Sequence, residues 1–225
     1  MPHGGTPQEA IAGLAPAHSA VHDARDAASG AIGQAGEERQ LVATTPTAGL
    51  VAIGHYLGLF PAEEGQWHHE VRRGPDIERL TEPEARAWAA PGDPSHRPSI
   101  LDTLVGRGLL VPVSWDDAIG FARAYRLLPL LSGLGPNPEN PDNCCIGTFG
   151  RPVVTVDRLG YELWVEAGGQ PSLWDACRRF AVTATEPTLI DPYAVLLALR
   201  DRLDTLTSAG AACLDLAVPA APGSE

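Results

Sequence analysis

The chain has 225 residues, of which 44% are hydrophobic and 20% are charged. It is therefore long enough for one large domain or two small ones, each with a packed core. Its net charge is −12, and all 16 basic residues are arginine. Because nucleic-acid binding needs clustered cations to neutralise phosphates, this balance disfavours DNA or RNA as a partner. No apolar run approaches the length of a membrane-spanning helix, so no membrane partner is expected.

Residues 1–40 differ from the rest of the chain in composition, because they are rich in alanine and glycine and carry few large apolar side chains. Such a segment buries too little apolar surface to offset its chain entropy, so we predict a disordered tail. It also lacks a basic region followed by an apolar one, which argues against a signal peptide. We therefore expect a cytoplasmic protein whose four cysteines are free thiols.

The following segment predicts strands and then two helices. Residues 41–60 form one or two apolar runs with strand character, punctuated by proline and glycine. Thr81 and Glu84 have the spacing of a capping box, which begins a helix that ends near Ala90. A second helix is expected over Ser99–Arg107, with Gly108 as its left-handed C-cap and an apolar strand after it.

The rest of the chain predicts a second set of elements. We expect a helix over 114–128, a loop rich in Pro, Gly and Asn over 132–143, and a strand over 151–157. Further helices are expected over 172–181 and from Asp191 onward. The sequence thus predicts an α+β fold, divided into a disordered tail (1–40), a first half with a linking helix (41–131), a loop (132–150) and a second half (151–218).

A weak internal repeat relates the two halves. Residues 101–108 read LDTLVGRG and residues 203–210 read LDTLTSAG, so that five of eight positions match at an offset of 102. Both segments end a predicted helix at a glycine and continue into an apolar stretch. If the repeat is real, each half has the order strand, helices, and a last helix that runs through glycine into a strand.

The segments Leu101–Val113 and Leu203–Leu216 resemble the end of a winged-helix domain, where a helix runs through glycine into a strand. Winged-helix domains bind DNA, dock proteins or, in one subtype, grip the leader of a peptide that a partner enzyme modifies. The resemblance to that subtype implies a short sheet before three helices, to which the peptide adds a strand. Strands over 41–60 followed by helices after residue 80 are similar to that order, in tandem.

Cys144 and Cys145 are the candidate redox residues. Adjacent cysteines can form a strained, easily reduced disulfide, and these two follow the predicted loop. The alternative is that one thiol faces a core and the other its rim, as small buried hydrophobes. The sequence has no C-x-x-C, so it does not support a thioredoxin-type mechanism.

A metal or cofactor site is not expected. The densest cluster of metal-ligand residue types is His68-His69-Glu70, where strand geometry would let His68 and Glu70 pair but would turn His69 away. A solvated turn is the alternative interpretation of this cluster. The sequence lacks the spacing of a zinc site, a phosphate-binding glycine loop and a serine-nucleophile motif, so no catalytic residue is predicted either.

Trp164 and Trp174 flank a predicted turn and are the candidate partner-binding residues, with core packing as the alternative.

The leading functional hypothesis is a non-catalytic protein- or peptide-docking module, an accessory subunit of a peptide-modifying or regulatory system. One alternative is a winged-helix DNA-binding regulator, which would need a spatial cluster of Arg97, Arg107, Arg123 and Arg126. The other is a thiol redox sensor or small enzyme that uses Cys144 and Cys145.

Overall fold

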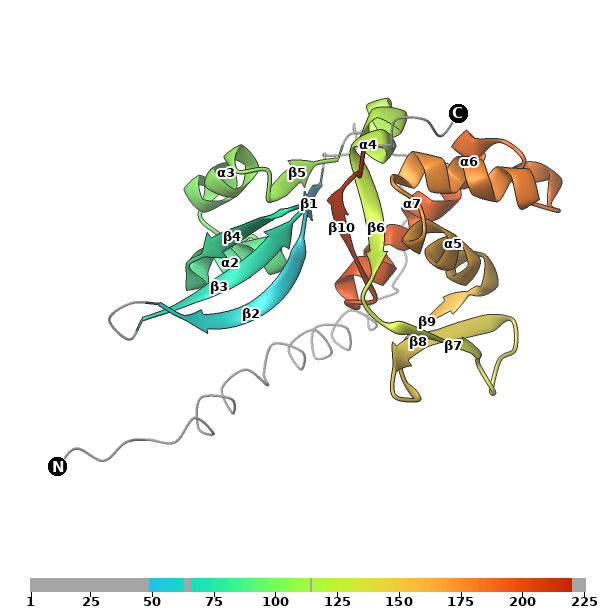
Figure 1. Cartoon of the computed structure of the whole chain (residues 1–225), viewed down its shortest axis with the longest axis horizontal. Coiled ribbons are helices and arrows are strands. Elements are labelled where there is room, and N and C mark those ends of the chain that lie inside the picture. Colours follow the sequence, from blue (N-terminus) through green and yellow to red (C-terminus); the bar gives the residue numbers. More distant parts are fainter. Residues whose placement is uncertain (1–48, 63–65, 114, 220–225) are drawn as a thin grey trace, which may run out of the picture. The chain divides into compact units, whose positions relative to one another are not determined.

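The computed structural model describes residues 49–62, 66–113 and 115–219. The fold is α+β, and all the paired strands of its described sheets are antiparallel (Figure 1). The tail predicted over 1–40 lies outside the described residues. Among the helices that are described, none has the length and apolar character needed to cross a membrane.

Among the described residues, the first half contains five strands and two helices. They follow the chain in the order β1 (Leu50–Ala52), β2 (His55–Pro61), β3 (Trp67–Arg73), β4 (Asp76–Leu80), α2 (Glu82–Ala89), α3 (Pro98–Gly106) and β5 (Leu110–Pro112). Strands β2, β3 and β4 form a three-stranded meander, and β5 returns to pair with β1. The expected capping box is present, because the Glu84 carboxylate accepts hydrogen bonds from the Thr81 backbone N–H and hydroxyl, both at 2.8 Å.

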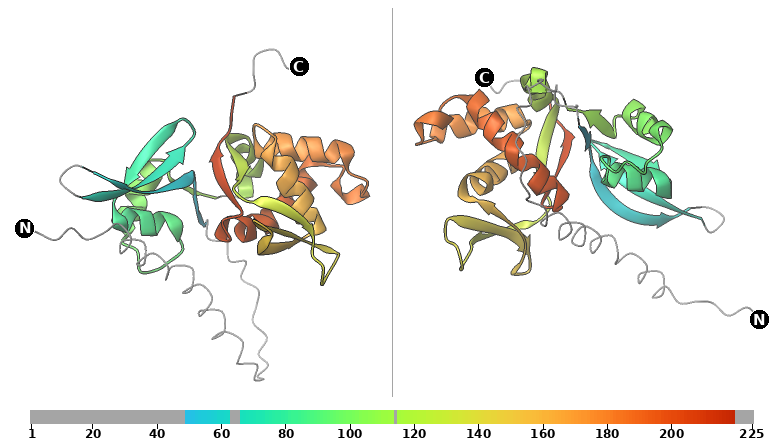
Figure 2. Two further views of the ribbon diagram at one scale, coloured as in Figure 1. Left: turned by 60° about the horizontal axis from the view of Figure 1, so that its bottom comes forward. Right: turned by 180° about the vertical axis from the view of Figure 1, so that it is seen from behind.

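The second half has the same plan with additional helices. Its elements are η2 (Trp115–Asp117), α4 (Ala118–Ala124), β6 (Tyr125–Pro129), β7 (Ser132–Pro136), β8 (Asn143–Thr148), β9 (Arg151–Asp157), α5 (Arg158–Gly168), α6 (Leu173–Thr183), η3 (Pro187–Leu189), α7 (Pro192–Ser208) and β10 (Ala212–Leu216). Strands β7, β8 and β9 form the meander, and β10 returns to pair with β6. Each half is therefore a strand, a three-stranded meander, helices and a returning strand (Figure 2).

The two halves share local detail as well as element order. Helices α3 and α7 end in the same way, at positions 102 residues apart. The Leu109 N–H donates to the Leu104 carbonyl and the Ala211 N–H to the Leu206 carbonyl, both at 2.9 Å. The glycine before each donor has a φ near +65°, which a residue with a Cβ adopts only with strain. The repeated LDTL segments thus mark equivalent helix ends.

The meanders are irregular at equivalent places. The pairing of β2 with β3 shifts register between Tyr56 and Gly58, and the pairing of β7 with β8 shifts between Gly133 and Gly135. These positions lie 77 residues apart. A bulge adds local twist to a strand, so both meanders are expected to twist more strongly at this place.

The described residues form two cores, one in each half, and Ile53 of the first half packs into the core of the second. In the first half, Val71 and Leu80 of the sheet pack against Leu104 of α3, together with Leu109 and Leu110. The core of the second half is larger and is built around α7, whose inward stripe is Val195, Leu196, Leu199, Leu203 and Leu206. The helical spacing in the sequence predicts the four leucines of this stripe, Leu196, Leu199, Leu203 and Leu206.

The structure corrects the predicted loop at 132–150, because β7 and β8 occupy most of it. Glycine in a strand often marks a close approach of another group, and Gly133 does so here. A Cβ at Gly133 would lie 2.1 Å from the Tyr161 hydroxyl. The helix expected over 114–128 is also shorter than predicted, since α4 ends at Ala124 and Tyr125 begins β6. The second half therefore begins near residue 115 rather than at 151.

Candidate functional site

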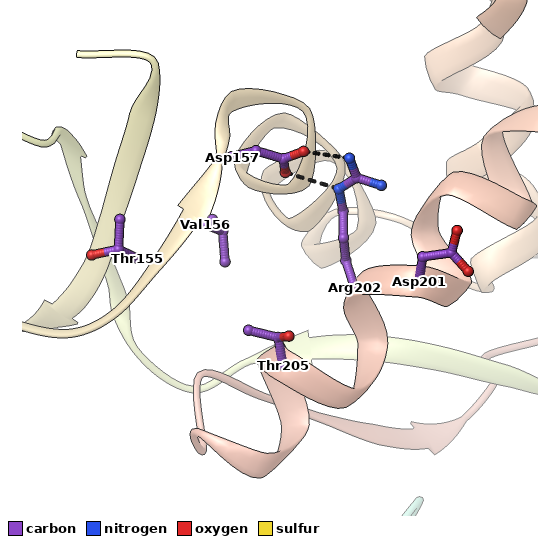
Figure 3. A pocket seen from close by; sticks show the side chains of 6 residues that line it. All are labelled: Thr155, Val156, Asp157, Asp201, Arg202 and Thr205. Carbon is purple, nitrogen blue, oxygen red and sulfur yellow. Dashed lines mark hydrogen bonds and ion pairs between the residues drawn. The ribbon is translucent and has the colours of Figure 1, made fainter. Parts of the chain in front are cut away.

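A groove lies between β9 and α7 in the second half. It has a volume of about 470 Å³. Thr155, Val156 and Asp157 line it from β9, and Asp201, Arg202 and Thr205 line it from α7 (Figure 3). Among the described strands, β9 pairs only with β8, so its other edge faces this groove.

An ion pair crosses the groove near one end. The Arg202 guanidinium donates to both carboxylate oxygens of Asp157, with an Nε–Oδ1 distance of 2.8 Å (Figure 3). Arg202 also donates to the Ala198 carbonyl of its own helix at 2.6 Å. Asp157 is the N-cap of α5 and accepts from the Gly160 N–H at 2.8 Å. One carboxylate thus fixes the start of α5 and ties it to α7.

Gly160 makes this arrangement sterically possible. A Cβ at this position would lie 2.7 Å from Asp157 Oδ1 and 2.9 Å from Arg202 Cδ.

The hydrogen bonds also keep the Asp157–Arg202 pair charged. The Arg202 guanidinium holds the pKa of Asp157 below its ordinary value, with the Gly160 N–H adding to this effect against the opposing effect of burial. The pair therefore stays ionised at neutral pH.

This lowered pKa predicts a pH dependence of stability. A carboxylate whose pKa is depressed by folding stabilises the protein above its unfolded pKa of about 4. That stabilisation is lost as the pH falls through the folded pKa. In urea unfolding, the difference in free energy between wild type and Asp157→Asn should be largest near neutral pH and should shrink under acid conditions. A difference that stays constant with pH would contradict this assignment.

The other groove residues leave the backbone edge of β9 accessible. Thr155 and Thr205 are exposed, and Val156 is buried as part of the core. Asp201 is paired with its neighbour Arg200 at 2.8 Å. Within the described residues, no side chain donates a hydrogen bond to a backbone carbonyl of β9. The groove thus combines an unpaired strand edge with a helix wall, which is the geometry that accepts an added strand.

A second polar cluster lies in the first half and links its sheet to α2. His69 is buried on β3, where Nδ1 lies 2.8 Å from the Tyr56 hydroxyl and Nε2 lies 2.6 Å from Glu82 Oε2. Glu82 is held in turn by Arg86 at 2.7 Å. The pKa of Glu82 is lowered, first by its hydrogen bond with His69 and further by Arg86. This closed network ties α2 to the sheet.

The structure places the His68-His69-Glu70 cluster in strand β3, so the solvated-turn interpretation is wrong. As strand geometry predicted, His68 pairs with Glu70, with 2.9 Å between Nε2 and Oε1, while His69 points to the other face. Among the described residues, no group of three or more His, Cys, Asp or Glu side chains is arranged to hold a metal ion.

The structure places the candidate redox cysteines in the central strand of the second meander. Cys144 and Cys145 are both free and both buried on β8, with exposures of 6% and 5%. Successive residues in a strand point to opposite faces, which separates the two thiols. The redox hypothesis requires exposed thiols, and these two are not exposed.

The thiols should consequently react slowly. Burial raises the pKa of Cys177 to about 12, and burial together with the Asp215 carboxylate raises that of Cys213 to about 11. We expect little reaction of the folded protein with Ellman's reagent at about pH 8, because the thiolate is the reactive form. All four thiols should react once the chain is unfolded in guanidinium. Rapid labelling of Cys144 or Cys145 in the folded protein would revive the redox hypothesis.

The two tryptophans proposed for partner binding lie in different surroundings. Trp164 is 4% exposed in the core, and its indole Nε1 donates to the Ala211 carbonyl at 3.3 Å. Trp174 is half-buried near the start of α6, with the Arg123 guanidinium 5.8 Å from its ring centre. The structure therefore places Trp164 away from any surface that a partner could reach.

The arginines required by the DNA-binding alternative are largely engaged within the protein. Arg107 forms ion pairs with Glu78 and Glu84, and Arg126 pairs with the buried Asp215. Arg123 lies over Trp174, and Arg97 is the N-cap residue of α3. Carboxylates thus neutralise two of the four charges that this alternative needs to be free.

Sequence reasoning missed the groove between β9 and α7. It predicted the strand that carries Asp157 and the helix that carries Arg202, but it treated β7 and β8 as a loop. Without that meander, β9 had no neighbour and hence no recognisable free edge. The available signal was Asp157 followed three residues later by glycine, a spacing suited to a helix N-cap.

Comparison with known proteins adds one partial match. A family model described as a family of unknown function (DUF6244) matches residues 5–49. That segment lies almost entirely outside the described residues and does not include the groove. No curated protein and no solved structure matches the chain.

Proposed function

We propose that the chain is a non-catalytic peptide-docking module, an accessory subunit of a peptide-modifying or regulatory system. The observation that carries this proposal is the open edge of β9 beside the wall of α7. An extended peptide would add to β9 as a fourth strand and place alternate side chains in the groove. The resemblance to the peptide-gripping winged-helix subtype supports the same use, since the meander β7–β9 precedes α5, α6 and α7 as that subtype requires.

The charges of the groove fit docking better than they fit catalysis. Asp157 and Arg202 neutralise each other, and the Asp201 carboxylate is balanced by Arg200. A strand that adds to β9 would gain affinity from main-chain hydrogen bonds, and the alternate side chains that enter the groove would select its sequence. The threonines on both sides offer hydroxyl groups for further contacts.

The test uses a library of random peptides displayed on phage and panned on the full-length protein. The edge of β9 is blocked by Thr155→Pro, because proline removes a backbone donor while an edge strand tolerates it. The matched control is Arg79→Pro, at the equivalent edge position of β4 in the first half. We expect wild type and Arg79→Pro to enrich peptides and Thr155→Pro to lose them.

Two results would overturn the proposal. One is the absence of enriched peptides on wild type. The other is an equal recovery of peptides by Thr155→Pro and wild type while both proteins show the same circular dichroism melting curve.

A further inference from the structure

In the first half, β4 and α3 correspond to β9 and α7, so the counterpart of the groove would lie between β4 and α3. Leu80 and Val156 each precede the N-cap of the next helix, so positions of β4 and β9 correspond at an offset of 76. Arg79 is thus the counterpart of Thr155. Helices α3 and α7 correspond at an offset of 102, which makes Thr103 the counterpart of Thr205.

This counterpart groove is closed by the side chain of Arg107. The guanidinium NH2 donates to the Arg79 backbone carbonyl at 2.8 Å, on the edge of β4 that no described strand covers. Two carboxylates hold the guanidinium in place, Glu78 at 2.8 Å and Glu84 at 3.2 Å. An added strand would need the carbonyl that Arg107 already occupies.

The second half lacks the equivalent of this closure. Ala209 stands where the first half has Arg107, and Val154 stands where it has Glu78. The backbones agree at the first of these positions, with φ/ψ of −79°/−4° at Ala209 and −84°/−5° at Arg107. At this position the two halves therefore differ in the side chain and not in the backbone conformation.

We propose that Arg107 is a specificity-determining residue that blocks strand addition in the first half, so that each chain docks one peptide, on β9. This inference rests on the proposed function, because it assigns that function to one of two duplicated grooves. It also gives a role to the Glu78–Arg107–Glu84 cluster. Edge strands in natural proteins are commonly protected by charged side chains, and here the protection is selective between two copies of one fold.

A reciprocal swap of residues tests this inference in the full-length chain. One variant carries Arg107→Ala with Glu78→Val, which gives the first half the residues of the second. The other carries Ala209→Arg with Val154→Glu, which gives the second half the residues of the first. The probe is the pool of displayed peptides selected on wild type. A photo-crosslinking benzoylphenylalanine at Thr103 or Thr205 reports which groove holds the peptide.

We expect wild type to crosslink from Thr205 and not from Thr103. Opening the first groove should raise the adduct at Thr103 about tenfold, and closing the second should lower the adduct at Thr205 by a similar factor, as the loss of a charged hydrogen bond implies. Because the two variants lie in different halves, a folding defect in one leaves the other informative.

Failure of this inference can be separated from failure of the proposed function. If wild type gives no adduct at Thr205, strand addition at β9 is wrong and the proposed function falls with it. If wild type gives that adduct but neither swap changes the adduct at its own groove, peptide docking stands and the role of Arg107 is wrong.

Discussion

Replacing Asp215 by alanine should destabilise the protein by about 3–5 kcal/mol, the range found when one partner of a buried ion pair is removed. The Asp215 side chain is 1% exposed on β10 and accepts from Arg126 at 3.0 Å and from the Gly74 N–H at 2.6 Å. Burial alone would raise the pKa of this carboxyl, but the hydrogen bonds from Gly74 and Arg126 outweigh it and lower the pKa. The variant leaves a guanidinium and a backbone N–H without their acceptor.

The loss of stability caused by Asp215→Ala is measured by urea unfolding near neutral pH. Asp201→Ala is the control, because Asp201 forms only an exposed pair with its neighbour and should change stability by less than about 1 kcal/mol. Gly74 lies between β3 and β4, whereas Asp215 lies on β10, so this carboxylate joins the two halves. A change at Asp215 no larger than that at Asp201 would show that the junction contributes little.

Replacing Trp164 by alanine should lower the free energy of unfolding by a similar amount, about 3–5 kcal/mol, because it removes a large aromatic side chain from a packed core. The ring is 4% exposed, and its centre lies 5.8 Å from that of Tyr161. Its indole also donates to the Ala211 carbonyl next to β10, so the variant loses this hydrogen bond, while the carbonyl keeps the one from the Leu130 N–H at 3.0 Å. The cavity and the lost hydrogen bond act in the same direction.

Trp174→Ala is the comparison for Trp164, since both tryptophans flank the same turn and only one is in the core. In urea unfolding, we expect Trp174→Ala to lower the free energy of unfolding clearly less than Trp164→Ala does. Trp174 is only half-buried, and it contacts Arg123 through its ring face. Equal losses for the two variants would contradict the assignment of Trp164 to the core.

Helices with sharp boundary signals were predictable from the sequence. Thr81 begins α2, Gly108 follows α3 and Asp191 caps α7, close to the expected positions. In each case a single residue type meets a local backbone requirement, so no knowledge of the tertiary fold was needed. The α+β fold class follows from the same signals.

The second meander was not predictable, because its strands carry residues that usually form turns. Strand β7 reads SGLGP, and its glycines are required by the neighbouring Tyr161 and by the bulge, neither of which is local in sequence. The groove depends on this meander, so it was missed as well. Residues from far apart in the chain, Asp157 and Arg202, become neighbours only once β9 and α7 have packed together.

The comparison of the two halves also shows why the proposed docking site does not follow from the fold alone. Both halves present an edge strand beside a helix, but Arg107 fills one groove and Ala209 leaves the other open. A similarity at the level of the backbone is therefore compatible with different uses.

The most direct test of strand addition is amide hydrogen exchange, measured on the full-length protein with and without a peptide selected by panning. Docking should slow exchange in β9 strongly and leave β4 unchanged, because a new strand protects the backbone amides of the edge to which it binds. Slower exchange in β4, or no change in β9 while the peptide is bound, would contradict docking at the groove between β9 and α7.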